Sequence, residues 1–518
     1  MAKVLSKYVY VGGLKCQKWL WLKFNAPEKL PPQDENMSHL FDQGNEVGLL
    51  AQQLFKNGAD ANPDNSSDIF ANDERTRALL KEGKIIFEAG FLTEDKKCYA
   101  RADVFVPVDA NKGIWDLYEV KQGTSVKDEH IEDVAFQKYC YENSGAGIKI
   151  RNCFVVHVNN EFIKNGVINP GKLFKTQDVT INVKDIMDDV PGKIKKMFEI
   201  IALKKCPEHE PGKYYCDDSY GVHENDEFYK KHSKMDIFQL VRAGQKAVDL
   251  FNAGVLHIKD IPEACKLNDK QKIQKQCHTN SKAYHDVKEI KKFLDSLKYP
   301  LYFMDFETYS TAIPLHDGTR PYQNVPFQFS VHVVEKQGAK AKHYSFLHRG
   351  KGDSREEFMK ELKACMGVKG TVLAFNAPFE KTILKECAEF LPKHKKFVDN
   401  ISERLIDLIV PFRNFFYYHP SQKGSSSLKK VLPAITGQSY DDLEISEGSS
   451  ASLQYLHTIV GHHTSRGKAG VEVSVQEAER KKLLKDLELY CGRDTEGMIW
   501  IVDKLITKFK GDGEKKNN

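Results

Sequence analysis

Apolar positions divide the chain into two α/β regions separated by a segment with little strand pattern. In the first region, short apolar runs predict strands at 84–91, 99–106, 114–120 and 153–158. Apolar residues at helical spacing predict helices at 46–54 and at about 130–142. The first region is therefore expected to be a mixed α/β domain.

A second α/β pattern occupies the C-terminal part of the chain. Apolar runs predict strands at 301–306, 327–334 and 371–375, and a long helix is expected at about 475–504. Between them, from about 207 to 297, the chain is rich in His, Lys, Asp and Tyr. We expect an N-terminal domain at 1–206, a mostly helical connector at 207–297, a second domain at 298–507 and a frayed basic tail at 508–518.

Length and composition agree with a folded protein of several domains. The chain has 518 residues, of which 41% are hydrophobic and 29% charged, and its net charge is +5. This charge permits binding to a polyanion without requiring it, so any basic groove must be local. Eleven scattered cysteines predict reduced thiols, and lysines interrupt the most apolar N-terminal stretch, so we expect no membrane segment and a cytoplasmic location.

Acidic residues at the end of a predicted strand are the clearest chemical feature. In FMDFET, Asp305 and Glu307 are two positions apart, so strand alternation places both carboxylates on one face. Paired carboxylates hold hard divalent cations, and two-metal phosphodiester cleavage needs several of them. The segment N-x-x-F-E brings Asn376 and Glu380 after another predicted strand, and Tyr490 and Asp494 are four apart on the last helix.

This ordered set resembles the DnaQ-like 3′ to 5′ exonucleases of the DEDDy type over about 300–505. The resemblance implies that Asp305, Glu307, Glu380 and Asp494 bind two Mg²⁺ or Mn²⁺ ions. It also implies that Tyr490 orients or helps to deprotonate the attacking water. Asp407 and Ser427-Leu428 match secondary signatures with a supporting role, and Glu380 stands where the family usually has Asp.

A second candidate site lies in the N-terminal region. Asp103 in one predicted strand and Glu119 with Lys121 in the next give the order D, then E-x-K, which a PD-(D/E)xK nuclease requires. An exposed Glu/Lys pair at a strand edge would give the same letters. Gln137 and Tyr141 follow on a helix as Q-x-x-x-Y, and Glu46 opens an upstream helix as a possible further metal ligand.

The N-terminal set is similar to the RecB-like nucleases, in which the Gln and Tyr contact substrate or brace the site. Related nucleases often hold an iron–sulfur cluster with one early and three late cysteines. Cys16, Cys206 and Cys216 invite that comparison, but the later cysteines are too few for the usual spacing, so a cluster is not the favoured expectation. The whole chain resembles an uncharacterised bacterial family that joins a RecB-like to a DnaQ-like domain, through GNEVG, EVK, DVAFQ, FMDFET, RPYQNVPFQFS and GSSSLKKVLP.

The sequence thus predicts a metal-dependent nuclease acting on DNA, single-stranded or with free ends, with a second centre in the N-terminal domain. The expected roles are DNA repair, degradation or defence. Asn376, and Arg320 and Gln328 just after the acidic pair, are candidate substrate contacts, although the segment that follows the acidic pair is also typical of a turn before a core strand. Two alternatives stay open: a 3′ to 5′ exoribonuclease, and a nucleic-acid-binding module with little catalytic activity.

Overall fold

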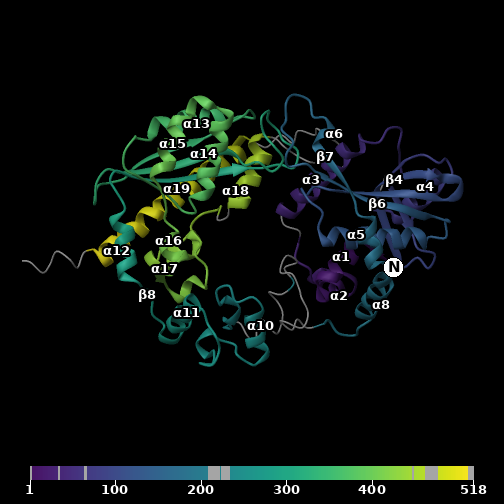
Figure 1. Cartoon of the computed structure of the whole chain (residues 1–518), viewed down its shortest axis with the longest axis horizontal. Coiled ribbons are helices and arrows are strands. Elements are labelled where there is room, and N and C mark those ends of the chain that lie inside the picture. Colours follow the sequence, from purple (N-terminus) through teal and green to yellow (C-terminus); the bar gives the residue numbers. More distant parts are fainter. Residues whose placement is uncertain are drawn as a thin grey trace, which may run out of the picture. The chain divides into compact units, whose positions relative to one another are not determined.

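The computed structural model describes residues 3–32, 35–63, 67–207, 222, 234–445, 448–460 and 477–510 (Figure 1). The described chain forms two compact units. Unit 1 comprises 3–207 together with 311–323, and unit 2 comprises 234–310, 324–460 and 477–510. The described part of the expected connector, 234–297, groups with unit 2, and the segment 311–323 groups with unit 1.

Unit 1 is built on a seven-stranded mixed sheet in the order β2-β3-β4-β5-β6-β7, with β1 paired to β4. The strands are β1 (Leu5–Ser6), β2 (Ala59–Asp60), β3 (Ile86–Leu92), β4 (Cys98–Asp109), β5 (Ile114–Lys121), β6 (Lys149–Val158) and β7 (Phe174–Asp178). Central strand β5 is antiparallel to β4 and parallel to β6. Asp103 lies on β4, and Glu119 and Lys121 lie on β5.

The helices of unit 1 form cores on both faces of its sheet. They are α1 (Lys7–Lys15), α2 (Gln17–Asn25), α3 (Glu35–Gln52), α4 (Ile69–Leu80), α5 (Asp128–Glu142), α6 (Pro170–Leu173), α7 (Thr180–Ile186) and α8 (Val190–Ile201). Trp115 and Leu117 of β5 join a core with α1, α2, α5 and α8. Tyr118 and Val120 of the same strand pack with Val47 of α3 in a separate cluster. Alternation along β5 therefore separates an α5 face from an α3 face.

Unit 2 contains a five-stranded mixed sheet in the order β11-β10-β9-β12-β13. Its strands are β9 (Leu301–Tyr309), β10 (Val325–Val334), β11 (Lys342–Leu347), β12 (Thr371–Ala374) and β13 (Leu405–Asp407). The first three form an antiparallel meander, and β12 and β13 run parallel to β9. A separate ribbon pairs β8 (Tyr284–His285) with β14 (Tyr417–Tyr418).

Helices cover both faces of the unit 2 sheet. They are α10 (Gln245–Asn252), α11 (Asp269–Asn280), α12 (Val287–Asp295), α13 (Arg355–Cys365), α14 (Pro378–Phe390), α15 (Lys395–Arg404), α16 (Val410–Arg413), α17 (Leu428–Thr436), α18 (Gly448–Tyr455) and α19 (Glu477–Phe509). Tyr302, Met304 and Phe306 of β9 pack into a core with α13, α14 and α15. The alternate positions of β9 are therefore turned toward the opposite face, which α18 and α19 cover.

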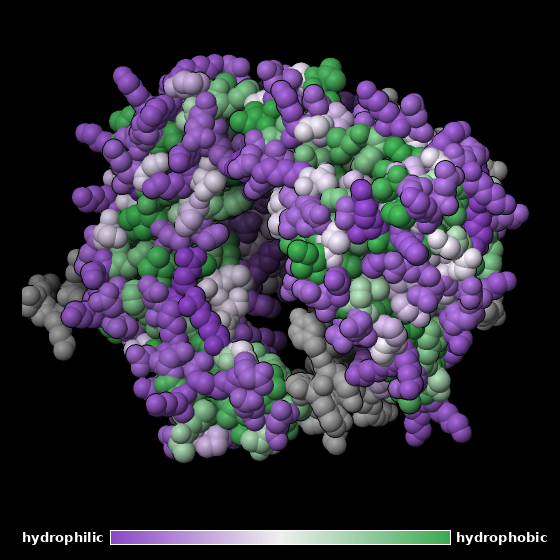
Figure 2. All heavy atoms as spheres, turned by 45° about the vertical axis from the view of Figure 1, so that its right-hand side comes forward, coloured by the Kyte–Doolittle hydropathy of each residue, from purple (hydrophilic) through white to green (hydrophobic). Residues whose placement is uncertain are grey.

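The structure confirms the mixed α/β class and the strands expected from the apolar runs. The main difference is at α3, which begins at Glu35, well before the predicted start at 46, and ends at Gln52. Among the described helices, none has the length and apolar character needed to cross a bilayer. Polar side chains cover much of the face shown in Figure 2, and hydrophobic residues form small separate patches on it.

Candidate active site

The two carboxylates of β9 lie on the face of the sheet opposite the α13–α15 core. Glu307 is 8% exposed, whereas the alternate residues Met304 and Phe306 are buried in the core on the other face of the sheet. One oxygen of Asp305, one of Glu307 and the sulfur of Cys491 all lie within 4.8 Å of one another. Strand alternation therefore places both carboxylates of the D-x-E motif on one face, as the spacing predicts, and one oxygen of each lies close to the other.

Helix α19 supplies the third carboxylate and the candidate tyrosine. Asp494 and Tyr490 are 7% and 4% exposed. The Cys491 thiol, between them in the sequence, contacts Asp305 Oδ2 at 3.6 Å. A side chain added at Gly448, the first residue of α18, would lie 3.7 Å from the Tyr490 hydroxyl and 3.8 Å from Glu307 Oε2. Tyr490 and Glu307 therefore border the same small space.

Glu380 completes the set from the first turn of α14. It is 3% exposed, and its Oε2 has no hydrogen-bond partner among the described residues. The preceding Asn376 has a φ of 80°, and its backbone N–H donates to Asp407 Oδ1 at 2.9 Å. Asp407 also accepts the N–H of Ile409 at 3.1 Å, so it supports the turn that delivers Glu380.

Burial raises the pKa of every carboxyl group in this set, and the charges of the other members add to the effect at Asp305 and Glu307. Burial, then the charges of Asp494, Glu307 and Glu380, raises the pKa of Asp305 well above its usual range. Burial and Asp494 do the same for Glu307. Burial raises the pKa of Glu380 to about 8 and that of Asp494 to about 6. Cations that joined the four groups would favour their charged forms.

Three residues near these carboxylates were not predicted from the sequence. The Tyr440 hydroxyl donates to Asp494 Oδ1, and the Lys429 ammonium lies 5.5 Å from the centre of the Tyr490 ring. Lys429 also lowers the pKa of Glu307 and Asp494. Lys429 follows Ser427-Leu428, so that motif marked its position, whereas no pattern pointed to Tyr440 or Cys491.

The predicted substrate contacts of this region have different surroundings. Gln328 lies opposite Glu307 on β10, is 1% exposed and donates from Nε2 to the Leu487 carbonyl at 2.9 Å. It therefore holds α19 against the sheet. Asn376 is exposed and accepts from Arg413 at 3.1 Å. Arg320 lies in the 311–323 segment, which groups with unit 1 and not with the carboxylates of unit 2.

Unit 1 contains a second buried set of charged residues on β4, β5 and α5. Lys121 Nζ donates to Glu119 Oε1 at 2.7 Å and to Asp133 Oδ2 at 2.6 Å. Gln137 Nε2 donates to Glu119 Oε2 at 2.8 Å and to Asp133 Oδ1 at 2.9 Å. Asp103 Oδ2 accepts the Val120 N–H at 2.5 Å. The structure thus brings together Asp103, Glu119, Lys121 and Gln137.

Two members of this unit 1 cluster were not assigned from the sequence. Asp133 belongs to the DVAFQ segment, so its motif was visible although its role was not. Lys7, on α1, donates to Glu119 Oε1 at 2.8 Å from 112 positions away in the sequence. No local pattern connects two positions so far apart, and only the fold identifies Lys7.

The lysines change the protonation of the cluster. Burial alone would lower the pKa of Lys121, but Asp133 and Glu119 raise it above its ordinary value. Burial raises the pKa of Asp133, yet Lys121 and Lys7 lower it below its usual range. Burial, with the charge of Asp103, raises the pKa of Glu119 to about 7. Lys7 and Lys121 therefore compensate much of the negative charge of this cluster.

The remaining predicted residues of unit 1 lie outside this hydrogen-bond network. Tyr141 is fully buried, accepts the Ala102 N–H at 2.9 Å and donates to the Ala89 carbonyl, so it braces β3 and β4. Glu46 is half-buried on α3, which packs through Val47 on the face of β5 opposite Glu119.

The three cysteines considered as cluster ligands differ in what the structure records. Cys16 is fully buried and disulfide-bonded, so the prediction that every cysteine is reduced is wrong for this residue. Cys206 is half-buried after α8. Cys216 lies outside the described residues.

Comparison with known proteins gives partial matches. Residues 302–427 match the family model "Domain of unknown function (DUF2779)". The chain is 26% identical over 238 residues to uncharacterized protein UU173 of Ureaplasma parvum serovar 3, covering 43% of this chain and 33% of the relative. It is 25% identical over 248 residues to the uncharacterized protein MG366 homolog of Mycoplasma pneumoniae, covering 43% and 36%.

The chain spans about a third of the length of these curated relatives. No solved structure matches it. What is established by comparison is a DUF2779 domain that contains Asp305, Glu307, Glu380 and Asp407 within its matched residues.

Proposed function

We propose that this protein is a metal-dependent nuclease that hydrolyses phosphodiester bonds at the carboxylate site of unit 2. The observation that carries the proposal is the convergence of Asp305, Glu307, Glu380 and Asp494 in one buried place, where burial raises all four pKa values and mutual repulsion adds to the effect at Asp305 and Glu307. Buried like charges are costly unless cations compensate them. Strongly perturbed carboxyl groups of this kind cluster at functional sites.

The residues fit hard divalent cations such as Mg²⁺ or Mn²⁺. Asp305 and Glu307 present oxygen atoms within 4.8 Å of each other, and the buried Glu380 Oε2 lacks a protein partner among the described residues. Oxygen ligands suit these ions, and burial keeps the neighbouring Cys491 thiol protonated by raising its pKa. When bound, two such ions activate water and neutralise charge on the phosphate.

The protein groups have separate roles in this proposal. Asp305, Glu307 and Asp494 hold the ions from β9 and α19, and Glu380 completes the set from α14. The Tyr490 hydroxyl borders the same space as Glu307, and burial with the Asp494 charge raises its pKa. Tyr490 is therefore placed to orient water as a hydrogen-bonding group.

For unit 1 we propose a second, weaker nuclease centre formed by Asp103, Glu119 and Lys121. Lys7 and Lys121 occupy Glu119 Oε1, so a cation can reach this carboxylate only if Lys7 moves away. Gln137 braces Glu119 and Asp133 in this arrangement. Together, the two sites support the proposal that a RecB-like domain is followed by a DnaQ-like domain with 3′ to 5′ exonuclease activity on DNA.

A matched pair of variants on one helix tests the proposal. Asp494→Asn removes a proposed ligand, whereas Asp486→Asn makes the same chemical change nearby on α19. End-labelled single- and double-stranded DNA and RNA of matched sequence would be incubated with Mg²⁺, Mn²⁺ or chelator. We expect stepwise shortening of DNA that requires metal, is lost in Asp494→Asn and is kept in Asp486→Asn. Equal activity of the two variants would refute the site, and preferential shortening of RNA would favour the exoribonuclease.

A further inference from the structure

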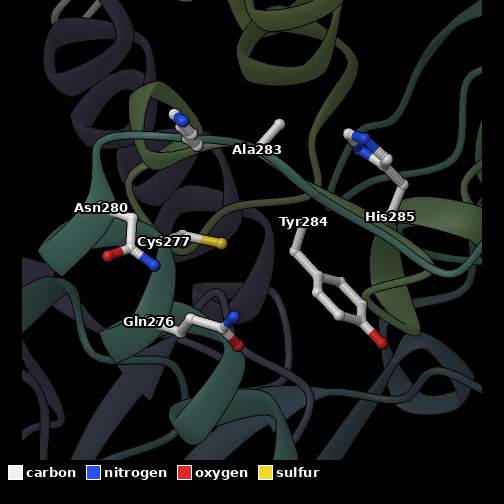
Figure 3. Close-up of a pocket in the computed structure, with 7 residues that line it drawn as sticks. Gln276, Cys277, Asn280, Ala283, Tyr284 and His285 are labelled. Carbon is white, nitrogen blue, oxygen red and sulfur yellow. The ribbon is translucent and has the colours of Figure 1, made fainter.

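Several cavities of unit 2 are lined by residues other than the proposed metal ligands, and two of them differ in charge. One, of about 380 Å³, lies between α11, which contributes Gln276, Cys277 and Asn280, and strand β8, which contributes Tyr284 and His285 (Figure 3). Its lining is almost entirely uncharged and selects no ligand class. The other, of about 480 Å³, is lined by several basic side chains.

Four basic residues line the second cavity. Arg242, Lys270, Arg413 and Lys423 come from four separate segments, and Ser425 with Ser426 adds hydroxyl groups. No carboxylate occurs among the described residues that line it. Four cations converging on one concave surface are the charge pattern expected of an anion site.

The cations are held close enough to affect one another. Lys270 Nζ donates to the Arg413 carbonyl at 2.7 Å, which fixes it against the cavity wall. Burial, then the charges of Arg242 and Arg413, lowers the pKa of Lys270. Arg413 has Asp407 as a counter-ion at 3.7 Å, but Asp407 is not in the lining. A bound anion would relieve this repulsion.

The loop at residues 423–424 lines the cavity in a fixed backbone conformation. Lys423 and Gly424 have φ values of 52° and 77°, and a side chain at Gly424 would lie 2.3 Å from the Gln239 carbonyl oxygen. Glycine therefore allows this loop to close against residue 239. Ser425 and Ser426 line the cavity just before the nine-residue helix α17 begins at Leu428.

We propose that this basic cavity binds a phosphoryl group of the nucleic-acid strand whose cleavage is proposed above. Arg413 lines the cavity and also donates to Asn376 Oδ1 at 3.1 Å, four residues before Glu380. Phe238, which is 41% exposed at the same cavity, offers a ring for stacking an unpaired base. The claim that this phosphoryl group belongs to a nucleic-acid strand rests on the proposed nuclease function, because a free phosphate or nucleotide has the same chemistry.

The test measures binding without cleavage, in the full-length protein with chelator. Fluorescence anisotropy of a labelled single-stranded oligonucleotide would compare Arg242→Ala/Lys270→Ala/Lys423→Ala with the control Lys360→Ala/Lys385→Ala/Lys396→Ala. The control removes three exposed cations from α13, α14 and α15, so the net charge change is equal. We expect the cavity variant to bind about tenfold or more weakly, with a salt slope reduced by about 2, and the control to change by less than about twofold.

Further arms separate the possible outcomes. If the triple variant does not fold by circular dichroism, Arg242→Ala/Lys423→Ala changes only exposed side chains and serves in its place. Equal weakening in cavity and control variants would overturn the site. If the cavity variant bound inorganic phosphate or a nucleoside monophosphate more weakly than the wild type but bound the oligonucleotide equally well, the nucleic-acid strand would not be the source of the phosphoryl group. Cavity-dependent oligonucleotide binding by a protein that cleaves nothing would refute the nuclease and keep the site.

Discussion

Unit 1 and unit 2 each bury several carboxylates beside a helix, but they compensate the negative charge differently. In unit 1, Lys7 and Lys121 contact Glu119 at 2.8 Å and 2.7 Å. In unit 2, the nearest supports are neutral donors, Tyr440 and Cys491, with Lys429 acting from farther away. Acidic motifs alone therefore do not define a metal site, because neighbouring lysines can compensate the carboxylate charge in place of a metal ion.

The largest expected effect is on cleavage. Asp305→Ala/Glu307→Ala should lower the rate on end-labelled DNA by about 10³-fold or more, because cation binding supplies several kcal/mol of transition-state stabilisation. Lys121→Ala, in the compensated cluster of unit 1, should lower it far less. Loss of cleavage only in Lys121→Ala would transfer the chemistry to unit 1. A wild-type protein that binds DNA but never cuts it would favour the binding-module alternative.

The second effect is on stability as a function of pH. The unit 2 carboxyl groups have raised pKa values, about 8 for Glu380 and about 6 for Asp494, so the folded state holds protons that the unfolded state releases. Their stabilisation is complete below about pH 4 and is lost as pH rises toward 8. In chelator, the free energy of unfolding should fall by on the order of 3 kcal/mol between pH 5 and pH 8.

Denaturant unfolding at several pH values measures this slope. Saturating Mg²⁺ should flatten it, because bound cations replace the protons. Glu380→Gln/Asp494→Asn should also flatten it in chelator, since the amides do not titrate. A slope that is the same in wild type and in this variant would show that the unit 2 carboxylates do not cause it.

The third effect concerns the lysine that compensates unit 1. Lys7→Met should destabilise the protein by about 2 kcal/mol, the typical contribution of a hydrogen bond between charged groups, because Glu119 keeps its burial but loses one cation. The same change should add a Mn²⁺ site, detectable by electron paramagnetic resonance titration. Lys3→Met, on a more exposed lysine of the same unit, is the control. No gain in Mn²⁺ binding would mean that Lys7 does not exclude the metal.

The smallest expected effect tests whether Tyr141 braces the fold or contacts the substrate. Tyr141→Phe removes a buried hydroxyl that joins β3 to β4, so the free energy of unfolding should fall by about 1 kcal/mol. DNA affinity and cleavage should not change, because the side chain is fully buried. A clear rise in Kd for DNA at unchanged stability would contradict this and return Tyr141 to the substrate contacts.

Local periodicity was sufficient to predict much of the fold. The expected strand 114–120 is β5 at Ile114–Lys121, and the expected helix 130–142 is α5 at Asp128–Glu142. Alternation also placed Asp305 and Glu307 on one face, because the side-chain period of a strand is a local property. Asp494 and Tyr490 share a helix for the same kind of reason.

Long-range contacts were beyond this reasoning. Lys7 reaches Glu119 across the sequence, and Tyr440 reaches Asp494 from a segment without a marked pattern. Exposure was equally hard to foresee: Gln328 looked like a substrate contact, yet it is buried and holds α19. These features share one cause, since a motif specifies a residue type and a local face but not what packs on that face.

The segment 311–323 has a consequence for how the gene can be divided. Ala312 and Ile313 belong to the same apolar cluster as Val47 and Phe174 of unit 1, although they follow β9 of unit 2 in the chain. A gene fragment that stops at residue 233 would encode a first unit lacking part of its interior. A fragment that starts at 234 would carry an apolar loop without its partners. The two units are therefore expected to be inherited, expressed and purified together.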